Sequence, residues 1–150
     1  MSISQEFPDL PPLWALGTAV ASVVVGRLVP IWSLPFPAFL LGAALIGAGL
    51  GLAAWAALWF RRKRTTIEPR ETPATLIVEG PFRINRNPIY TGMTFVIVGI
   101  AMMAGTLGSL ITAFAFPVIV TTRFIRGEEA ALLSSFGAEA ERYLARTRRW

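Results

Sequence analysis

Residues 38–60 of the chain read AFLLGAALIGAGLGLAAWAALWF, a run without a charged side chain. A helix of this length measures about 35 Å, enough to cross a hydrocarbon core of about 30 Å. Prolines precede the run, the last at Pro37, and a basic cluster at residues 61–64 follows it. Within the run, Ala43, Gly47 and Gly51 recur every four residues, a spacing that predicts close approach of a neighbouring helix. We therefore predict a membrane-spanning helix over residues 38–60.

Composition places the whole chain in a membrane. Of its 150 residues, 54% are hydrophobic and 15% are charged, whereas soluble domains carry about 25% charged residues. The sequence contains no Cys and no His, which excludes disulfides, thiolate nucleophiles, Cys/His metal sites and imidazole catalysis. In so apolar a chain, the net charge of +5 indicates contact with anionic lipid. We expect an integral membrane protein with no metal site and no nucleic-acid partner.

Further apolar runs complete the predicted bundle. Residues 13–29 lack the basic start and the cleavage site of a signal peptide, so we interpret them as a retained span. The uncharged run 87–122 is too long for one crossing, because a single helix there would measure about 54 Å. We expect it to turn back at residues 105–109. The predicted fold class is all-α integral membrane: four transmembrane helices (13–29, 38–60, 89–104, 110–124) in a single domain, 1–150, plus a C-terminal amphipathic cytoplasmic helix.

Positive side chains gather at one end of this bundle. All Lys and Arg residues except Arg27 lie in the expected loop 61–88 or from residue 123 onward. Four spans put both termini and this loop on the same side of the membrane. By the positive-inside rule, that side is cytoplasmic.

The tail is predicted to form one amphipathic helix over residues 127–146, with Leu132, Phe136 and Tyr143 on its apolar face. Glu129 falls on the same face. Because an unpaired buried carboxylate is costly, Glu129 either pairs with an arginine of the 61–88 loop or receives a ligand. We favour the pairing with an arginine, and both remain open on the sequence alone.

Two arginines stand just before the glutamates of the tail. Arg123 and Arg126 occupy the end of the fourth predicted span and the start of the tail. One of them neutralises Glu128 or Glu129, or holds the anionic group of an acceptor. The sequence does not distinguish these roles.

Two motifs in the second half of the chain resemble those of a known group of enzymes. Residues 80–92 read GPFRINRNPIYTG and are similar to the signature G-P-Y/F-x-x-x-R-H/N-P-x-Y-x-G of the isoprenylcysteine carboxyl methyltransferase and phospholipid methyltransferase superfamily. Residues 128–143 resemble the same superfamily's ending, E-E-x-x-L-x-x-x-F-G-x-x-Y/F-x-x-Y. The resemblance covers roughly residues 65–147.

The resemblance implies a cytoplasm-facing site for S-adenosylmethionine and a lipidic or small amphiphilic acceptor that enters from the bilayer. An arginine suits the carboxylate of this cofactor, a glutamate its amino group, and an aromatic ring its sulfonium. The implied catalytic residues are Arg86, Tyr90 and Glu129. The implied cofactor-binding residues are Gly80, Phe82, Arg86, Asn87, Pro88, Tyr90, Gly92, Glu128 and Glu129.

Asn87 stands where the better-known members have His. Asn forms hydrogen bonds but does not carry a proton at neutral pH. A carboxylate acceptor attacks as it is, whereas an ammonium or a thiol must first lose a proton, to Glu128, Glu129, Tyr90 or water. We therefore favour a carboxylate acceptor. The resemblance extends to prokaryotic sequences with Asn at this position, so Asn87 does not indicate an inactive enzyme. The expected location is a prokaryotic cytoplasmic membrane.

Other interpretations belong to different classes. In the first alternative, the chain is a non-catalytic membrane scaffold or a lipid-binding relative of the family. This alternative predicts no cofactor affinity. A sterol-reductase-like enzyme would need a nicotinamide site, and the sequence contains no G-x-G-x-x-G fingerprint. The acceptor's head group and the oligomeric state are not encoded in any pattern of the sequence.

Overall fold

The computed structural model describes residues 9–64 and 74–150 of the chain. Residues 1–8 and residues 65–73, the latter within the expected 61–88 loop, lie outside the described part. Within it the fold is all-helical, which confirms the all-α class. The elements are α1 (Pro11–Leu28), α2 (Phe36–Lys63), the 3-10 helix η2 (Gly80–Arg83), α3 (Pro88–Ala104), α4 (Leu107–Ala113), α5 (Ala115–Val120), the π-helical turn η3 (Thr121–Ile125), α6 (Arg126–Phe136) and α7 (Ala138–Arg146).

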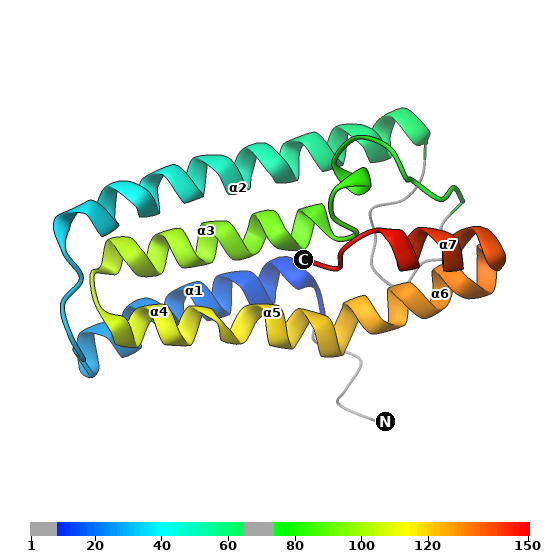
Figure 1. Ribbon diagram of the computed structural model, residues 1–150. Helices are drawn as coiled ribbons and strands as arrows, with labels where there is room; N and C mark the ends of the chain where they lie inside the picture. The colour runs from blue at the N-terminus through cyan, green and yellow to red at the C-terminus, as the bar shows by residue number, and fades with distance from the viewer. Residues whose placement is uncertain (1–8, 65–73) are drawn as a thin grey trace, which may run out of the picture.

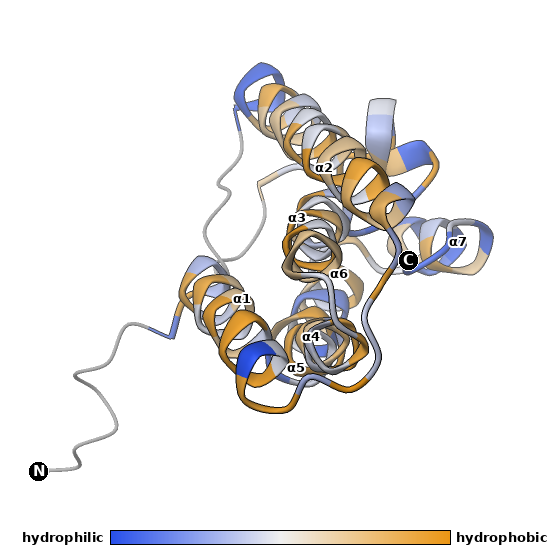
Figure 2. Ribbon diagram, turned by 90° about the vertical axis from the view of Figure 1, so that its left-hand side faces the viewer, coloured by the Kyte–Doolittle hydropathy of each residue, from blue (hydrophilic) through white to orange (hydrophobic). Residues whose placement is uncertain are grey.

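Three helices in the described part are long and apolar enough to cross a membrane. They are α1, α2 and the helical stretch Leu107–Phe136, which comprises α4, α5, η3 and α6. The apolar α3 has 17 residues and measures about 25 Å, slightly less than a core of about 30 Å. Figure 2 shows apolar residues on outward-facing as well as inward-facing sides of the bundle, as expected of helices surrounded by lipid.

The helix α3 lies at the centre of the bundle. It makes its most extensive contact with α2, and it also contacts α1, α4 and α5; the end-on view of Figure 2 shows α2 and α1 on different sides of it. At one end of the bundle the Leu34 N–H donates to the Gly105 carbonyl at 2.8 Å, joining two turns. The opposite end, which we call the polar end, carries η2, α6 and α7 (Figure 1).

Three helices begin one or two residues before their predicted spans, each with a proline in its first turn. α1 begins at Pro11 and α3 at Pro88, and α2 begins at Phe36 with Pro37 in its first turn. The N–H groups of a first helical turn have no acceptor within the helix, so proline is tolerated there. α2 also continues to Lys63, because its basic last turn complements the negative end of the helix dipole. The loop after it therefore starts at Arg64 rather than at residue 61.

The contact between α2 and α3 uses a different row of glycines from the one predicted. Gly47 and Gly51 face open space. Gly49 lies against α3 instead, where a Cβ atom would overlap the carbonyl oxygen of Gly92. α2 is apolar and small-residue-rich all round, so its sequence offers two such rows and does not select between them.

The fourth long helix starts at Leu107, three residues before its predicted start. The preceding Gly105 has φ +79°, and the Thr106 side chain caps the helix by accepting from the Ser109 N–H at 3.2 Å. The α-helix is interrupted at Phe114, where Pro117 lacks the N–H that would donate four residues back.

The predicted single tail helix over residues 127–146 is wrong. Its first part, α6, continues the fourth helix through η3, and α6 ends at Gly137. Gly137 has φ +50° and ψ −125°, a conformation that residues with a Cβ atom avoid. The chain then folds back into α7, which lies beside α6 (Figure 1). The apolar periodicity continues across Gly137, which is why the sequence pattern reads as one helix.

Candidate functional site at the polar end

The segment before α3 is organised by its own asparagines. The buried Asn85 side chain accepts from the Asn87 N–H at 2.6 Å and donates to the Thr91 hydroxyl at 2.7 Å. Asn87 takes the N-cap position of α3, although its side chain makes no capping bond. Asn85 therefore shapes this turn and fixes where Arg86 leaves the backbone.

The two predicted glycines of the motif both serve packing. Gly80 has φ +59°, and a Cβ atom on it would overlap the indole of Trp59. Gly92 lies in the α2–α3 interface, against Gly49. Helix packing and backbone conformation thus explain both glycines without a ligand.

Phe82 and Pro88, also predicted to line the cofactor, are buried inside the protein. Phe82 belongs to a hydrophobic cluster with Ala56, Ile77 and Tyr143, and its carbonyl accepts from the Tyr143 hydroxyl at 2.8 Å. Burial raises the pKa of Tyr143 to about 12, against the opposing effect of the nearby Arg86 and Arg146 charges. This cluster anchors α7 and η2 to the end of α2.

Tyr90 and Glu128 meet across the bundle. The buried Tyr90 side chain, on α3, donates its hydroxyl to Glu128 Oε1, on α6, at 2.7 Å. A hydrogen bond to a carboxylate is stronger than a neutral one. The structure thus brings together two predicted site residues that are 38 positions apart.

Glu129 receives two arginines. Arg86 Nη1 lies 3.2 Å from Glu129 Oε1, and the Arg149 guanidinium binds both carboxylate oxygens, with Nε at 3.0 Å and Nη2 at 2.6 Å. The Glu129 and Arg86 side chains are only 13% and 15% exposed. The expected pairing with a loop arginine is confirmed. The hydrogen bond to Glu129 raises the pKa of Arg149.

The end of the chain lies beside the segment before α3, which the sequence did not indicate. The Arg86 N–H donates to the Arg148 carbonyl at 2.8 Å, and the Asn87 side chain donates to the Arg149 carbonyl at 3.0 Å. From the sequence, Arg148 and Arg149 indicated only the orientation of the protein in the membrane. No spacing of residues in the sequence predicts their contact with the motif.

Arg123 and Arg126 also differ in what they contact. Arg123 forms an ion pair with Asp9 at 3.0 Å, and its guanidinium lies 4.8 Å from the centre of the Trp14 ring. It therefore ties the fourth helix to the start of α1. Arg126 is exposed and lines a groove on the same helix.

We call Arg86, Tyr90, Glu128, Glu129 and Arg149 the polar cluster. It contains one buried donor that the protein leaves unused: Arg86 Nε has no hydrogen-bond acceptor within the described part of the chain. A buried donor without an acceptor costs about 1–3 kcal/mol. The cluster therefore has unsatisfied capacity for an anionic group, next to carboxylates that bind a cationic one.

The described residues define an apolar helical bundle with a charged cluster at one end, the architecture of an integral membrane protein with a polar site. The chain matches the phospholipid methyltransferase family over residues 37–139, more than half of its length, and it belongs to that family. This family is part of the wider isoprenylcysteine carboxyl and phospholipid methyltransferase group. No curated protein and no solved structure matches the chain.

Family membership gives the coarse activity, a methyltransferase embedded in a membrane. The matched region includes Arg86, Tyr90, Glu128 and Glu129 and ends before Arg149. Four members of the polar cluster therefore lie within the matched range, and Arg149, the second arginine on Glu129, lies outside it.

Proposed function

We propose that this protein transfers a methyl group from S-adenosylmethionine to a lipidic or small amphiphilic acceptor at the cytoplasmic face of the membrane. The observation that carries the proposal is the meeting of Arg86, with its unused buried Nε–H, and Glu129 beside the Tyr90–Glu128 pair. A mostly buried arginine and two carboxylates supply complementary partners for both charges of an amino-acid group. The family match supports the transfer of a methyl group.

The polar cluster fits the cofactor by the chemistry of its donors and acceptors. Arg86 would bind the carboxylate of the cofactor, and Glu129 would accept from its amino group after exchanging Arg149. When bound, S-adenosylmethionine supplies an activated methyl group on a sulfonium, which the Tyr90 ring would attract as a cation. Gly80, Phe82, Asn87, Pro88 and Gly92 would shape the wall behind these groups rather than bind through their own side chains.

We favour a carboxylate acceptor, as in the isoprenylcysteine carboxyl methyltransferases. Asn87 does not carry a proton, and its side-chain amide already donates to the Arg149 carbonyl. The Tyr90–Glu128 pair would have to accept the proton of an ammonium or thiol acceptor. A carboxylate needs no such step, so positioning and exclusion of water supply the catalysis.

We further propose that residues 1–150 form a single domain with four crossings, so that both termini and the loop before η2 face the cytoplasm. α3 counts as the fourth crossing, because it is flanked by longer helices that contact it. The excess of basic residues at the polar end supports this orientation. The basic face would then lie on the inner side of a prokaryotic cytoplasmic membrane, with the lipid bilayer as its partner.

Calorimetric titration with S-adenosylhomocysteine, the demethylated product, tests the cofactor site. We expect micromolar binding to the detergent-purified protein and at least tenfold weaker binding to Arg86→Ala and Glu129→Ala, a loss of about 1.4 kcal/mol or more. Arg83→Gln and Glu139→Gln are matched controls, because both side chains are exposed outside the polar cluster. No binding to a folded wild type would instead favour a non-catalytic scaffold or lipid-binding relative.

Turnover with labelled cofactor tests the acceptor. We expect methylation of a prenylated or otherwise lipidic carboxylic acid and slower or no methylation of amine lipids and thiols of equal chain length. Turnover confined to amines or thiols would overturn the preference for a carboxylate and leave the cofactor site intact.

A further inference from the structure

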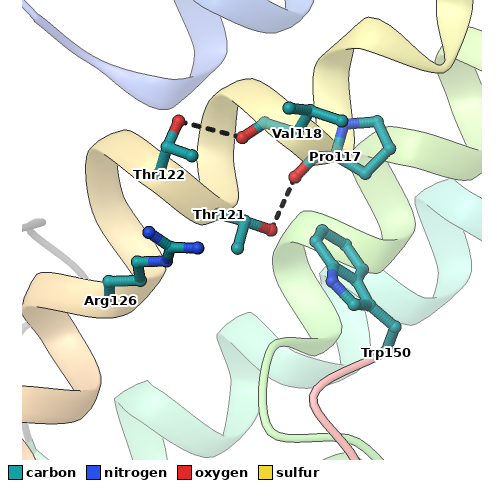
Figure 3. Close-up of a pocket in the computed structure, with 6 residues that line it drawn as sticks. All are labelled: Pro117, Val118, Thr121, Thr122, Arg126 and Trp150. Carbon is teal, nitrogen blue, oxygen red and sulfur yellow. Dashed lines mark hydrogen bonds between the residues drawn. The ribbon is translucent and has the colours of Figure 1, made fainter.

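The fourth helix carries a groove that adjoins the polar cluster. Figure 3 shows Pro117, Val118, Thr121 and Thr122 on the helix, with Arg126 at one end of the group and the Trp150 ring across from Thr121. The groove has a volume of about 270 Å³, close to the lower end of the roughly 300–1,000 Å³ typical of ligand pockets. Trp150 lines the groove and directly follows Arg149, which pairs with Glu129, so neighbouring residues of the chain link the groove to the polar cluster.

One cation in this groove is available to a ligand. Arg126 is exposed and has no hydrogen bond or ion pair to another described residue. The Thr121 and Thr122 hydroxyls donate to carbonyls of their own helix, at Pro117 and Val118 (Figure 3). Among the residues that line the groove, Arg126 is therefore the cation that an anionic group would find free.

An exposed apolar row leads along the helix to this cation. Ile111, Phe114 and Val118 are 60%, 54% and 63% exposed, and they follow one another at helical spacings of three and four residues. Thr122 and Arg126 continue the row. Arg126 lies 19 residues after the start of the helix at Leu107, roughly 28 Å, about the thickness of the hydrocarbon core. The row therefore spans the depth of acyl chains, and Arg126 reaches the depth of head groups.

We propose that this groove binds one anionic phospholipid, with its phosphate on Arg126 and an acyl chain along Ile111, Phe114 and Val118. The charge of Arg126 and its depth in the membrane favour this occupant. The residues that line the groove include one cation, at the membrane interface, and apolar side chains lie below it. The indole of Trp150 suits the same interface, where tryptophan is enriched. The π-helical turn η3 supplies Thr121 and Thr122, and such turns are frequent at functional sites. The inference does not depend on methyl transfer.

Native mass spectrometry of the detergent-purified full chain, titrated with phosphatidylglycerol or phosphatidylcholine of equal chain length, tests this site. We expect one phosphatidylglycerol to bind at least fivefold more tightly than phosphatidylcholine, and Arg126→Gln to remove this preference. Arg61→Gln is the matched control, because Arg61 is an exposed arginine near the same end of the bundle that does not line the groove. Soluble glycerol phosphate should not compete, since the apolar row requires a chain.

A second pair of variants tests the shape of the groove without changing its charge. Val118→Trp fills the groove and should weaken phosphatidylglycerol binding at least threefold, whereas Leu50→Trp, at an exposed position on α2 outside the row and the groove, should not. The proposal is overturned if Arg126→Gln and Arg61→Gln weaken binding equally, or if the wild type does not prefer the anionic lipid. Competition by glycerol phosphate would also overturn it, in favour of a site for free phosphate. Melting temperatures of all variants verify that each sample is folded.

Discussion

The α2–α3 interface and the helix α6 are held in place by different kinds of contact. In the interface, Gly42 and Gly49 bring the backbones of two helices together, with no room for a Cβ atom. α6 buries no residue at all, and its glutamates hold it to Tyr90, Arg86 and Arg149. Close packing therefore supplies stability in one region, and a few charged contacts position the candidate site in the other. Substitutions should separate the two.

The largest effect is expected at Gly49. Gly49→Ala places a methyl group against the Gly92 carbonyl, and overpacking of this kind costs about 1–3 kcal/mol of the free energy of unfolding. Gly47→Ala, on the same helix but facing open space, should leave stability unchanged or raise it by up to about 1 kcal/mol. Unfolding in detergent, followed by tryptophan fluorescence, measures both. A larger loss of stability from Gly47→Ala than from Gly49→Ala would show that α2 packs through the 43–47–51 row.

The next largest effect on stability is expected at Tyr143, which lies between the two regions. Tyr143→Phe removes the bond to the Phe82 carbonyl and leaves that acceptor buried, at a cost of about 1–3 kcal/mol. The folded pKa of about 12 lies above the ordinary value of 10.0, so the protonated hydroxyl is favoured by folding. Its contribution to stability is complete below pH 10 and is lost as the pH rises through about 12.

Ultraviolet titration of tyrosinate measures this pKa directly. The chain has two tyrosines, so Tyr90→Phe leaves Tyr143 as the single reporter. We expect the tyrosinate signal near pH 12, together with unfolding. Ionisation of a folded sample near the ordinary pKa would show that the side chain is solvated.

The same division explains how much of the molecule the sequence predicts. Long apolar runs locate the long helices, because the bilayer requires backbone groups to be satisfied within each helix. The starts of α1 and α2 were misplaced by two residues, because prolines lie inside their first turns, and α3 begins at Pro88, one residue before its predicted span. The row of glycines that packs was not predictable, since α2 is apolar on every side.

The candidate site was predictable only where residues are close in sequence or shared by the family. The motif residues and the paired glutamates identified Arg86, Tyr90, Glu128 and Glu129, and the need of a buried carboxylate for a partner predicted the Glu129–Arg86 pair. Arg149 was missed because its contact arises from the break at Gly137 and the folding back of α7. A continuous helix over residues 127–146 would have carried it elsewhere.

Arg149→Gln tests the charged contacts of the polar cluster directly. The Arg149 side chain is 39% exposed, so the loss of stability should stay below about 1 kcal/mol. Because Glu129 then has one cation fewer to exchange, S-adenosylhomocysteine should bind about threefold more tightly, by about 0.7 kcal/mol. Calorimetry in parallel with the wild type measures the change. Weaker binding would mean that Arg149 itself contacts the cofactor.

The smallest effect concerns the ion pair between Lys63, at the end of α2, and Glu79, just before η2. The hydrogen bond from Lys63, 2.6 Å long, lowers the pKa of Glu79 below its ordinary value of 4.5. A lowered folded pKa adds stability above pH 4.5 that is lost as the pH falls through the folded value. The two side chains are 31% and 44% exposed, so water screens the pair and limits it to a few tenths of a kcal/mol. Lys63→Gln should remove this acid dependence of the melting temperature, whereas Arg61→Gln should retain it. If both variants follow the wild-type acid profile, α2 and η2 are held together by their apolar contacts alone.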